Sequence, residues 1–173
     1  MAFLFLDLLS YVVHRAQHAT PLLWRLHALH HSDPDVDVTT AVRHHPFEFI
    51  LASGVFWLAV LVLGVPISAA AVHGTTVFVL AALTHCNTRW PSWLERLLRP
   101  LLITLDLHLV HHSVNQRDLN RNFGAVFSAW DRLLGTFARP SSAELTFGVA
   151  ELTRADACRP LAMLLTPWRM RSP

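Results

Sequence analysis

Three groups of histidines have the spacing of a metal site. Two of them share the pattern His-x-x-His-His, and the third has two histidines four residues apart. In chain order the groups are His14 and His18; His27, His30 and His31; and His108, His111 and His112. Residues three and four apart lie on one face of a helix, so each group can direct its imidazoles toward one region. Eight imidazoles suffice for two metal ions if the three helices converge, and we predict that they do.

The types of ligand restrict which metals the site can hold. Imidazole without thiolate suits iron, zinc, copper or nickel, whereas a structural zinc site needs four ligands and commonly includes cysteine. Cys86 and Cys158 form no spaced motif,. Eight imidazoles exceed the need of one ion, so the pattern predicts a dinuclear centre. The isolated His73 is expected to be hydrogen-bonded among the helices and not bound to metal.

The composition places these groups in a membrane protein. Of the 173 residues, 53% are hydrophobic and 15% are charged, and the mean hydropathy is +0.37,. The chain contains no glycine-rich phosphate loop and no G-x-S-x-G motif, which argues against a nucleotide enzyme or a serine hydrolase. It also lacks a basic helix, an RNP signature and a zinc finger, so we expect no nucleic-acid partner.

The first two histidine groups are expected on two consecutive helices. An apolar run over 1–13 continues into the first group, and Thr20-Pro21 separates it from a second helix over 22–31,. The 13 residues before His14 rise only about 20 Å, which is short of the roughly 30 Å hydrocarbon layer,. This helix therefore begins inside the bilayer, or an upstream segment is missing. The polar stretch 32–37 contains three aspartates but departs from the EF-hand pattern, so we expect a solvated loop there,.

A long uncharged stretch follows. Residues 49–88 contain no Asp, Glu or Arg and are interrupted at Gly64-Val65-Pro66, which predicts a transmembrane hairpin with arms over 47–63 and 67–83,. Arginines flank the hairpin on both sides and are absent from its tip; they are Arg15, Arg25 and Arg43 before it and Arg89, Arg96 and Arg99 after it. The positive-inside rule then places both ends, and all three histidine groups, on the cytoplasmic face.

The remaining segments are predicted to lie along the membrane surface or over the histidine groups. Residues 94–107 are amphipathic and broken at Pro100, 125–134 read as a short helix before Gly135, and 140–142 as a turn,. The tail, about 160–173, has the composition of an interfacial anchor. We thus predict one all-α domain over 1–173, an integral membrane helical bundle with a hairpin at about 47–84 and a histidine-rich cap on the cytosolic side.

With the hairpin between the second and third groups, the sequence resembles the fatty acid hydroxylase/sterol desaturase superfamily of integral-membrane diiron oxygenases. The resemblance covers nearly the whole chain. Besides the histidine groups it rests on four further motifs: His45-Pro46…Glu48, Thr84-His85-Cys86-Asn87, Asn122-Phe123-Gly124, and the sequence WDRLLGT at 130–136.

The resemblance implies nine iron ligands. They are His14, His18, His27, His30, His31, His85, His108, His111 and His112, and His85 joins the set on the resemblance alone. His45, Asp7, Tyr11, Asp106 and Asp131 could orient ligands through hydrogen bonds, although each could equally be a helix cap or a surface pair. His44 is expected to be solvated. Members often carry a further histidine four residues from the middle one, and here those places are Ala81 and Arg89.

The same resemblance implies a membrane-bound oxygenase with two iron ions that hydroxylates or desaturates a lipid with dioxygen. Fatty acyl, sterol, and carotenoid or other terpenoid substrates all remain open. Electrons would come from a ferredoxin or a small haem protein with its NAD(P)H reductase. A zinc-holding or degenerate member that acts as a lipid-binding or structural protein is the alternative. A metal transporter is disfavoured, because the hairpin contributes only His73 and His85.

Overall fold

The computed structural model describes residues 1–139 and 145–170, and across these residues the chain is helical, as the sequence predicts. Extended contacts in the described part are isolated bridges, which join Leu102 to Phe127 and Ser113 to Phe147. The turn predicted at 140–142 and the last three residues of the predicted tail lie outside the described residues.

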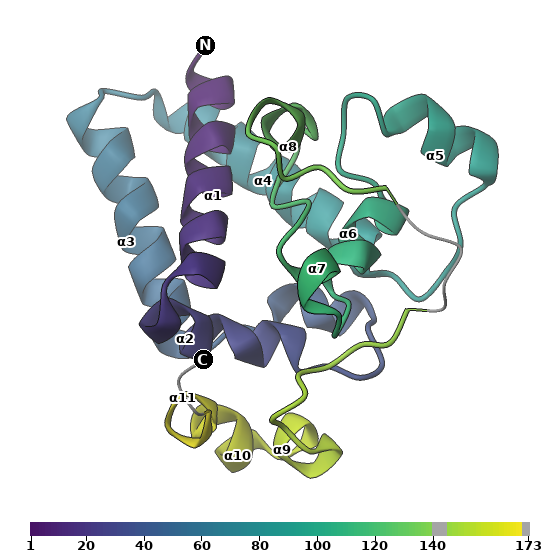
Figure 1. The fold of residues 1–173 in the computed structure, drawn as a ribbon. Coiled ribbons are helices and arrows are strands. Elements are labelled where there is room, and N and C mark those ends of the chain that lie inside the picture. Colours follow the sequence, from purple (N-terminus) through teal and green to yellow (C-terminus); the bar gives the residue numbers. More distant parts are fainter. Residues whose placement is uncertain (140–144, 171–173) are drawn as a thin grey trace.

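Three long apolar helices form one half of the molecule. They are α1 (Ala2–Ala19), α3 (Pro46–Val62) and α4 (Ile67–His85), and a short turn containing Gly64 at φ +62° joins the last two. α1 packs against both α3 and α4, which diverge from each other (Figure 1). A small core of Leu6, Val60 and Ala70 joins the three helices. The arms of the predicted hairpin are therefore present as helices, but α1 packs with both of them.

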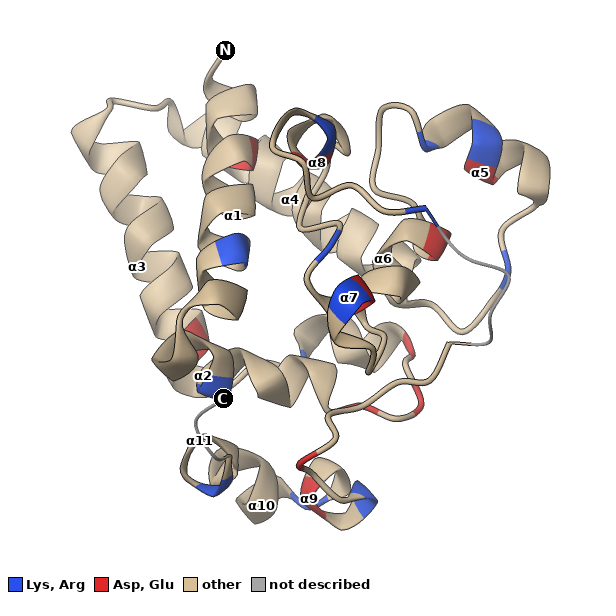
Figure 2. Ribbon diagram, in the orientation of Figure 1, with Lys and Arg blue, Asp and Glu red and all other residues tan. Residues whose placement is uncertain are grey.

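The surface of these helices suits a lipid environment. Among the described residues α4 is the one helix long and apolar enough to cross a membrane, and α3 falls just short at 17 residues. Large apolar side chains such as Leu58, Leu61, Val72 and Phe78 are exposed on them. Charged residues are absent from α3 beyond its first turn and from α4 (Figure 2). These features indicate membrane association, while a crossing by both arms stays a prediction.

The other half carries the remaining histidines. α2 (Pro21–His31) follows α1 directly, with Pro21 in its first turn, and packs against α1 and α3 (Figure 1). The 3₁₀ helix η1 (Val38–Val42) leads from α2 to α3 and contacts the end of α4. Beyond α4, the short helix α6 (Leu105–His111) packs back against α4, and α7 (Gln116–Leu119) follows it.

The two segments predicted at 94–107 and 125–134 contain only short helices. α5 (Ser92–Leu98) ends before Pro100, and the chain up to α6 is not helical. The helix predicted over 125–134 is only α8 (Ala129–Leu133). The backbone N–H groups of Val126 and Phe127 donate instead to the Asp7 carboxylate, at 3.0 and 3.2 Å. These N–H groups and the Val126 carbonyl form hydrogen bonds with distant parts of the chain. Because they are therefore not used within a helix, the helix begins later than predicted.

The C-terminal segment packs beneath α2. It contains α9 (Arg154–Cys158), α10 (Pro160–Leu164) and α11 (Thr166–Arg169), and α11 contacts α2 (Figure 1). Leu161, Leu164 and Trp168 are exposed. An exposed apolar edge of this kind is what the predicted interfacial tail requires, and its insertion into a membrane surface stays a prediction.

Candidate metal centre

Nine histidines lie in two adjoining clusters. The five-histidine cluster consists of His14, His18, His27, His31 and His111, and the four-histidine cluster of His30, His85, His108 and His112. Within each cluster the candidate ligand nitrogens are all within 4.8 Å of one another. The rings of His31 and His112 stack across the boundary with centroids 4.5 Å apart. The structure therefore brings together all nine residues that were predicted as ligands.

Each His-x-x-His-His motif contributes to both clusters. In the first motif the outer pair, His27 and His31, belongs to the five-histidine cluster and His30 to the four-histidine cluster. In the second motif the assignment is reversed, since His111 belongs to the five-histidine cluster and the outer pair to the other. Residues four apart share a helix face, whereas successive residues differ by about 100°. One helix can therefore supply imidazoles to two ions.

Backbone carbonyls fix the tautomer of four cluster histidines. Nδ1 lies within hydrogen-bond distance of a carbonyl oxygen in His14 (Phe123, 2.9 Å), His30 (Thr40, 3.1 Å), His85 (Ala81, 2.7 Å) and His111 (Arg121, 2.8 Å). A carbonyl oxygen can only accept, so Nδ1 carries the hydrogen in each ring. The Nε2 atom of each neutral ring then has a free lone pair, as a metal ligand requires.

The free lone pairs face one another at short distances. The Nε2 atoms of His14 and His111 are 3.0 Å apart, and those of His30 and His85 are 3.4 Å apart. Neither pair can form a hydrogen bond in this tautomer, because both atoms are acceptors. Ligands of a tetrahedral ion with metal–nitrogen bonds of 2.0–2.1 Å would be separated by about 3.3 Å. The spacing is that of nitrogens around a cation, and the donor set fits a metal.

Burial keeps these imidazoles neutral. Removal from water lowers the pKa of His30, His31, His108, His111 and His112 well below the ordinary value, and neighbouring histidines lower it further,. Both ring nitrogens of His18 and His31 are buried without a hydrogen-bond partner. Neutral imidazoles with unpaired nitrogens are the form that binds a metal, so these residues fit the same interpretation.

A buried carboxylate borders the five-histidine cluster. Oε1 of Glu48 accepts hydrogen bonds from Nδ1 of His27 at 2.7 Å, Nδ1 of His44 at 2.9 Å and the Gln17 amide at 3.2 Å. Glu48 belongs to the His45-Pro46…Glu48 motif, but no role was predicted for it from the sequence. The expectation for His44 also needs correction, because its side chain is only about a third exposed (32%) and its ring stacks on His30. The spacing of His44 and Glu48, four apart at a helix start, was the available signal.

The loop at 121–124 carries two of the accepting carbonyls and is held from three directions. Asn122 has a positive φ of 54°, and its amide nitrogen donates to the carbonyls of Leu107 and Ala138. Asp131 accepts from the N–H groups of Phe123 and Gly124 at 2.7 and 2.9 Å. Asp131 also accepts from the Thr136 hydroxyl, which contacts the Tyr11 hydroxyl at 2.8 Å. Asp131 and Tyr11 thus act on the loop, which in turn orients His14 and His111.

The other three candidate orienting residues make their hydrogen bonds elsewhere. Asp7 accepts from the Trp130 indole at 2.7 Å as well as from the two backbone amides described above. Nδ1 of His45 accepts from the Phe47 N–H, and its Nε2 lies 3.1 Å from the Leu164 carbonyl. Asp106 pairs with Arg99 at 3.2 Å near the surface. These side chains hold segments of backbone, and none of these bonds reaches a cluster histidine.

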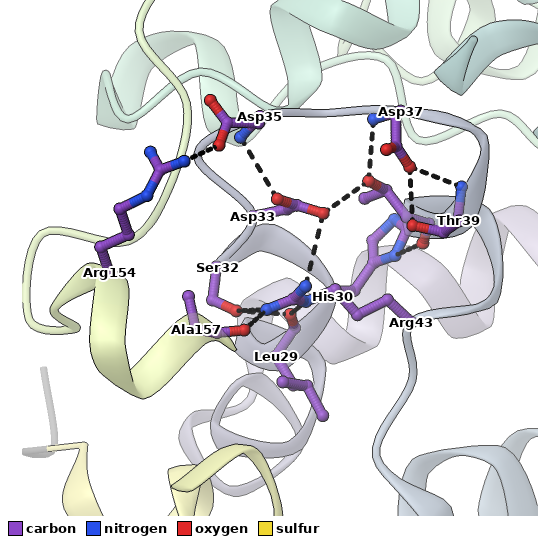
Figure 3. A network of polar contacts seen from close by, with 11 residues as sticks. Leu29, His30, Ser32, Asp33, Asp35, Asp37, Thr39, Arg43, Arg154 and Ala157 are labelled. Atoms are coloured by element: carbon purple, nitrogen blue, oxygen red, sulfur yellow. Dashed lines mark hydrogen bonds and ion pairs between the residues drawn. The ribbon is translucent and has the colours of Figure 1, made fainter. Parts of the chain in front are cut away.

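The turn after α2 supports His30. The Asp33 carboxylate accepts from the Thr40 hydroxyl at 2.8 Å, and the carbonyl of Thr40 is the partner of His30. Arg43 pairs with Asp33 and donates to the carbonyls of Leu29 and Ala157 (Figure 3). Asp33 is buried, so the loop at 32–37 is not simply solvated as predicted. Its acidic residues accept hydrogen bonds from other groups of the fold.

An apolar cavity of about 390 Å³ leads to the clusters from between α1, α3 and α4. Its walls include Leu9, Val13, Phe56 and Trp57, and its polar end is formed by His14, Gln17, His44 and Glu48. A volume of this size is in the range of small-molecule sites. The shape would direct an apolar chain toward the five-histidine cluster.

Comparison with known proteins gives a consistent picture. Residues 1–136 match the fatty acid hydroxylase family. The chain is 33% identical over 138 residues to ornithine lipid hydroxylase OlsE of Rhizobium tropici, and 32% identical over 143 residues to alkylglycerol monooxygenase of Homo sapiens. It is 31% identical over 153 residues to methylsterol monooxygenase erg25A of Aspergillus fumigatus. The first relative is named as a hydroxylase and the other two as monooxygenases.

These alignments cover 78, 79 and 82% of this chain but only 41, 29 and 47% of the respective relatives. The chain therefore spans less than half the length of each. No solved structure matches the chain significantly.

Proposed function

Because the chain belongs to the fatty acid hydroxylase family, we propose that it binds two iron ions and uses dioxygen to hydroxylate or desaturate a membrane lipid. The observation that carries this proposal is the pair of histidine clusters with lone pairs facing each other at 3.0 and 3.4 Å. The names of the relatives, which are lipid hydroxylases and monooxygenases, support the class of reaction.

The nine clustered histidines would hold the metals, and iron would supply the reduction of dioxygen and the oxidation of a C–H bond. The residues of the chain prepare the site for this chemistry. Carbonyls of the 121–124 loop, of Thr40 and of Ala81 hold Nδ1–H groups, so that Nε2 of each ring faces the cluster. Glu48 does the same for His27 through an anionic acceptor, which makes the imidazole a stronger donor,.

The apolar cavity would hold the substrate. Its walls are mainly apolar, and among its lining residues His14 is the one member of the clusters. A lipid chain entering between α1 and α3 would place a C–H bond beside the five-histidine cluster. The exposed apolar faces of α3 and α4 would lie in the membrane, with the clusters at its cytoplasmic surface,. Electrons would come from a separate ferredoxin or haem protein with its reductase, and residues 1–173 would act as one domain.

The test is metal analysis of purified protein from iron-replete cells together with dioxygen-dependent oxidation of lipids from the expression host. We expect about two irons per chain, as the two clusters indicate. His111→Ala removes a ligand and also the Nε2 contact with His14, so it should lose most of the iron and the activity,.

His45→Gln is the matched control, because His45 is an equally buried histidine whose bonds go to backbone groups. This variant should keep its iron. Full iron occupancy in His111→Ala would refute the ligand assignment. Stoichiometric zinc without dioxygen uptake would instead favour a lipid-binding or structural member of the family.

A further inference from the structure

His73 is a buried polar residue that the two clusters do not use. It lies on α4, its side chain is 2% exposed, and neither ring nitrogen has a hydrogen-bond partner. Two other described histidines, His18 and His31, also have both nitrogens unpaired, and both belong to the five-histidine cluster. A buried polar group without a partner costs about 1–3 kcal/mol. The expectation from sequence, that His73 is hydrogen-bonded among the helices, is therefore wrong within the described residues.

The ring of His73 is held in place by aromatic contacts. Phe3 packs edge-on against it with centroids 5.1 Å apart, and Phe56 stacks on it at 5.8 Å and 20°. The Asp7 carboxylate lies close to the ring, but its Oδ1 is 3.8 Å from Nε2 and thus beyond hydrogen-bond distance,. Both oxygens of Asp7 already accept hydrogen bonds, from two backbone amides and the indole of Trp130. Asp7 therefore leaves the imidazole unpaired.

His73 also lines the apolar cavity that ends at the five-histidine cluster. Phe56, which stacks on His73, is eight residues along α3 from Glu48 at the cluster end of the cavity. At 1.5 Å per residue this corresponds to about 12 Å along the helix. A molecule that fills the cavity would thus lie against an unpaired imidazole at a level about 12 Å along α3 from the cluster end of the cavity,.

We propose, on the basis of the proposed function, that His73 forms a hydrogen bond with a neutral oxygen of the lipid substrate. The substrate would then carry a hydroxyl, ether or carbonyl oxygen about 12 Å from the carbon that reacts. An N–H group of the imidazole can donate a hydrogen bond to any of these oxygens. In a cavity with mainly apolar walls, one polar contact fixes how far the chain enters and which carbon reaches the cluster.

The test is a binding competition with metal-loaded protein in lipid nanodiscs. The probes are 9-hydroxystearate and stearate, which differ by one hydroxyl nine carbons from the methyl end, and each displaces radiolabelled stearate. One hydrogen bond is worth about a tenfold preference for the hydroxylated probe in the wild type. His73→Phe keeps the ring shape and should reduce the preference to about onefold, while His73→Gln keeps a donor and an acceptor and should retain part of it.

Metal content and melting temperature of each variant are measured on the same samples and should equal those of the wild type. A wild type without preference, or a His73→Phe variant that keeps it, overturns the inference. If His73→Phe does not fold, the inference is tested by two measurements: the preference of the wild type for the hydroxylated probe, and whether His73→Gln reduces that preference. The proposed function fails separately: a chain that holds no metal yet prefers the hydroxylated probe would refute the oxygenase and leave this inference standing.

Discussion

At the scale of single residues, the cluster histidines depend on groups behind them. Among the described residues Glu48 is the one carboxylate that is hydrogen-bonded to them, at 2.7 Å from Nδ1 of His27. It also bonds His44 and Gln17, so its position is fixed from three sides. A hydrogen bond to a charged acceptor is worth about 1.5–3 kcal/mol, more than one to a neutral acceptor.

Glu48→Gln tests this role, because glutamine keeps the shape and one acceptor but removes the charge. We expect the affinity for metal to fall about 10- to 100-fold, as is usual when a partner of a ligating histidine is changed. The measurement is metal retention against chelators of graded strength. Glu151→Gln, at an exposed site, is the control and should match the wild type. Unchanged retention in Glu48→Gln would show that His27 needs no anionic partner.

The nine clustered histidines could be predicted because helical spacing of three and four residues determines which side chains share a face, and eight of them follow that spacing. His85 lies outside the two repeated motifs and was found only through the resemblance to a family. The division of each motif between two clusters depends on how α2 and α6 are rotated against each other, which spacing alone does not give. The sequence also could not identify the carbonyls of Arg121 and Phe123 as hydrogen-bond acceptors for the cluster histidines, since every residue has a carbonyl.

At the scale of elements, the C-terminal helices are tied to the base of the site. Arg43, just after η1, donates to the carbonyl of Leu29 on α2 and to that of Ala157 on α9, and it pairs with Asp33 (Figure 3). Arg154 pairs with Asp35 in the same region. The segment at 145–170 lies beyond the residues matched by the family.

Arg43→Ala should loosen this attachment. Removing several buried hydrogen bonds costs about 2–3 kcal/mol, which corresponds to a melting temperature lower by about 5–10 °C for a chain of this size. Trypsin should also cleave faster after the exposed Arg154. The measurements are thermal unfolding and limited proteolysis in detergent, with the exposed Arg117→Ala as the control. Equal cleavage rates in both variants would mean that other contacts hold the segment.

The observed bounds of the long helices agree more closely with the predicted bounds than those of the short helices do. α3 and α4 lie within two residues of the predicted arms, because a run of apolar residues bounded by Gly and Pro leaves few alternatives. α8 is shorter than predicted because the backbone before it bonds to Asp7, more than a hundred residues away. Local pattern cannot reveal a competition between helix formation and a distant carboxylate.

At the scale of the whole molecule, the polar site and the apolar surface occupy different ends. The clusters lie where α1, α2, α4 and α6 converge, and the turn between α3 and α4 lies at the far end of these helices (Figure 1). Charged residues follow the same division, since none lies on the turn, on α4 or on α3 beyond its first turn (Figure 2). A membrane around α3 and α4 would therefore separate the turn from the clusters.

Cysteine labelling tests this separation. In a Cys86→Ser background the exposed Cys158 reports the cluster side, and Ser68→Cys reports the turn. With a membrane-impermeant maleimide on sealed vesicles of known orientation, we expect Cys158 to be labelled from the cytoplasmic face and the cysteine at 68 from the opposite face. Both sites should react after solubilisation. Labelling of both from the cytoplasmic face would mean that α3 and α4 enter the membrane without crossing it, because a crossing hairpin must place its turn on the other side.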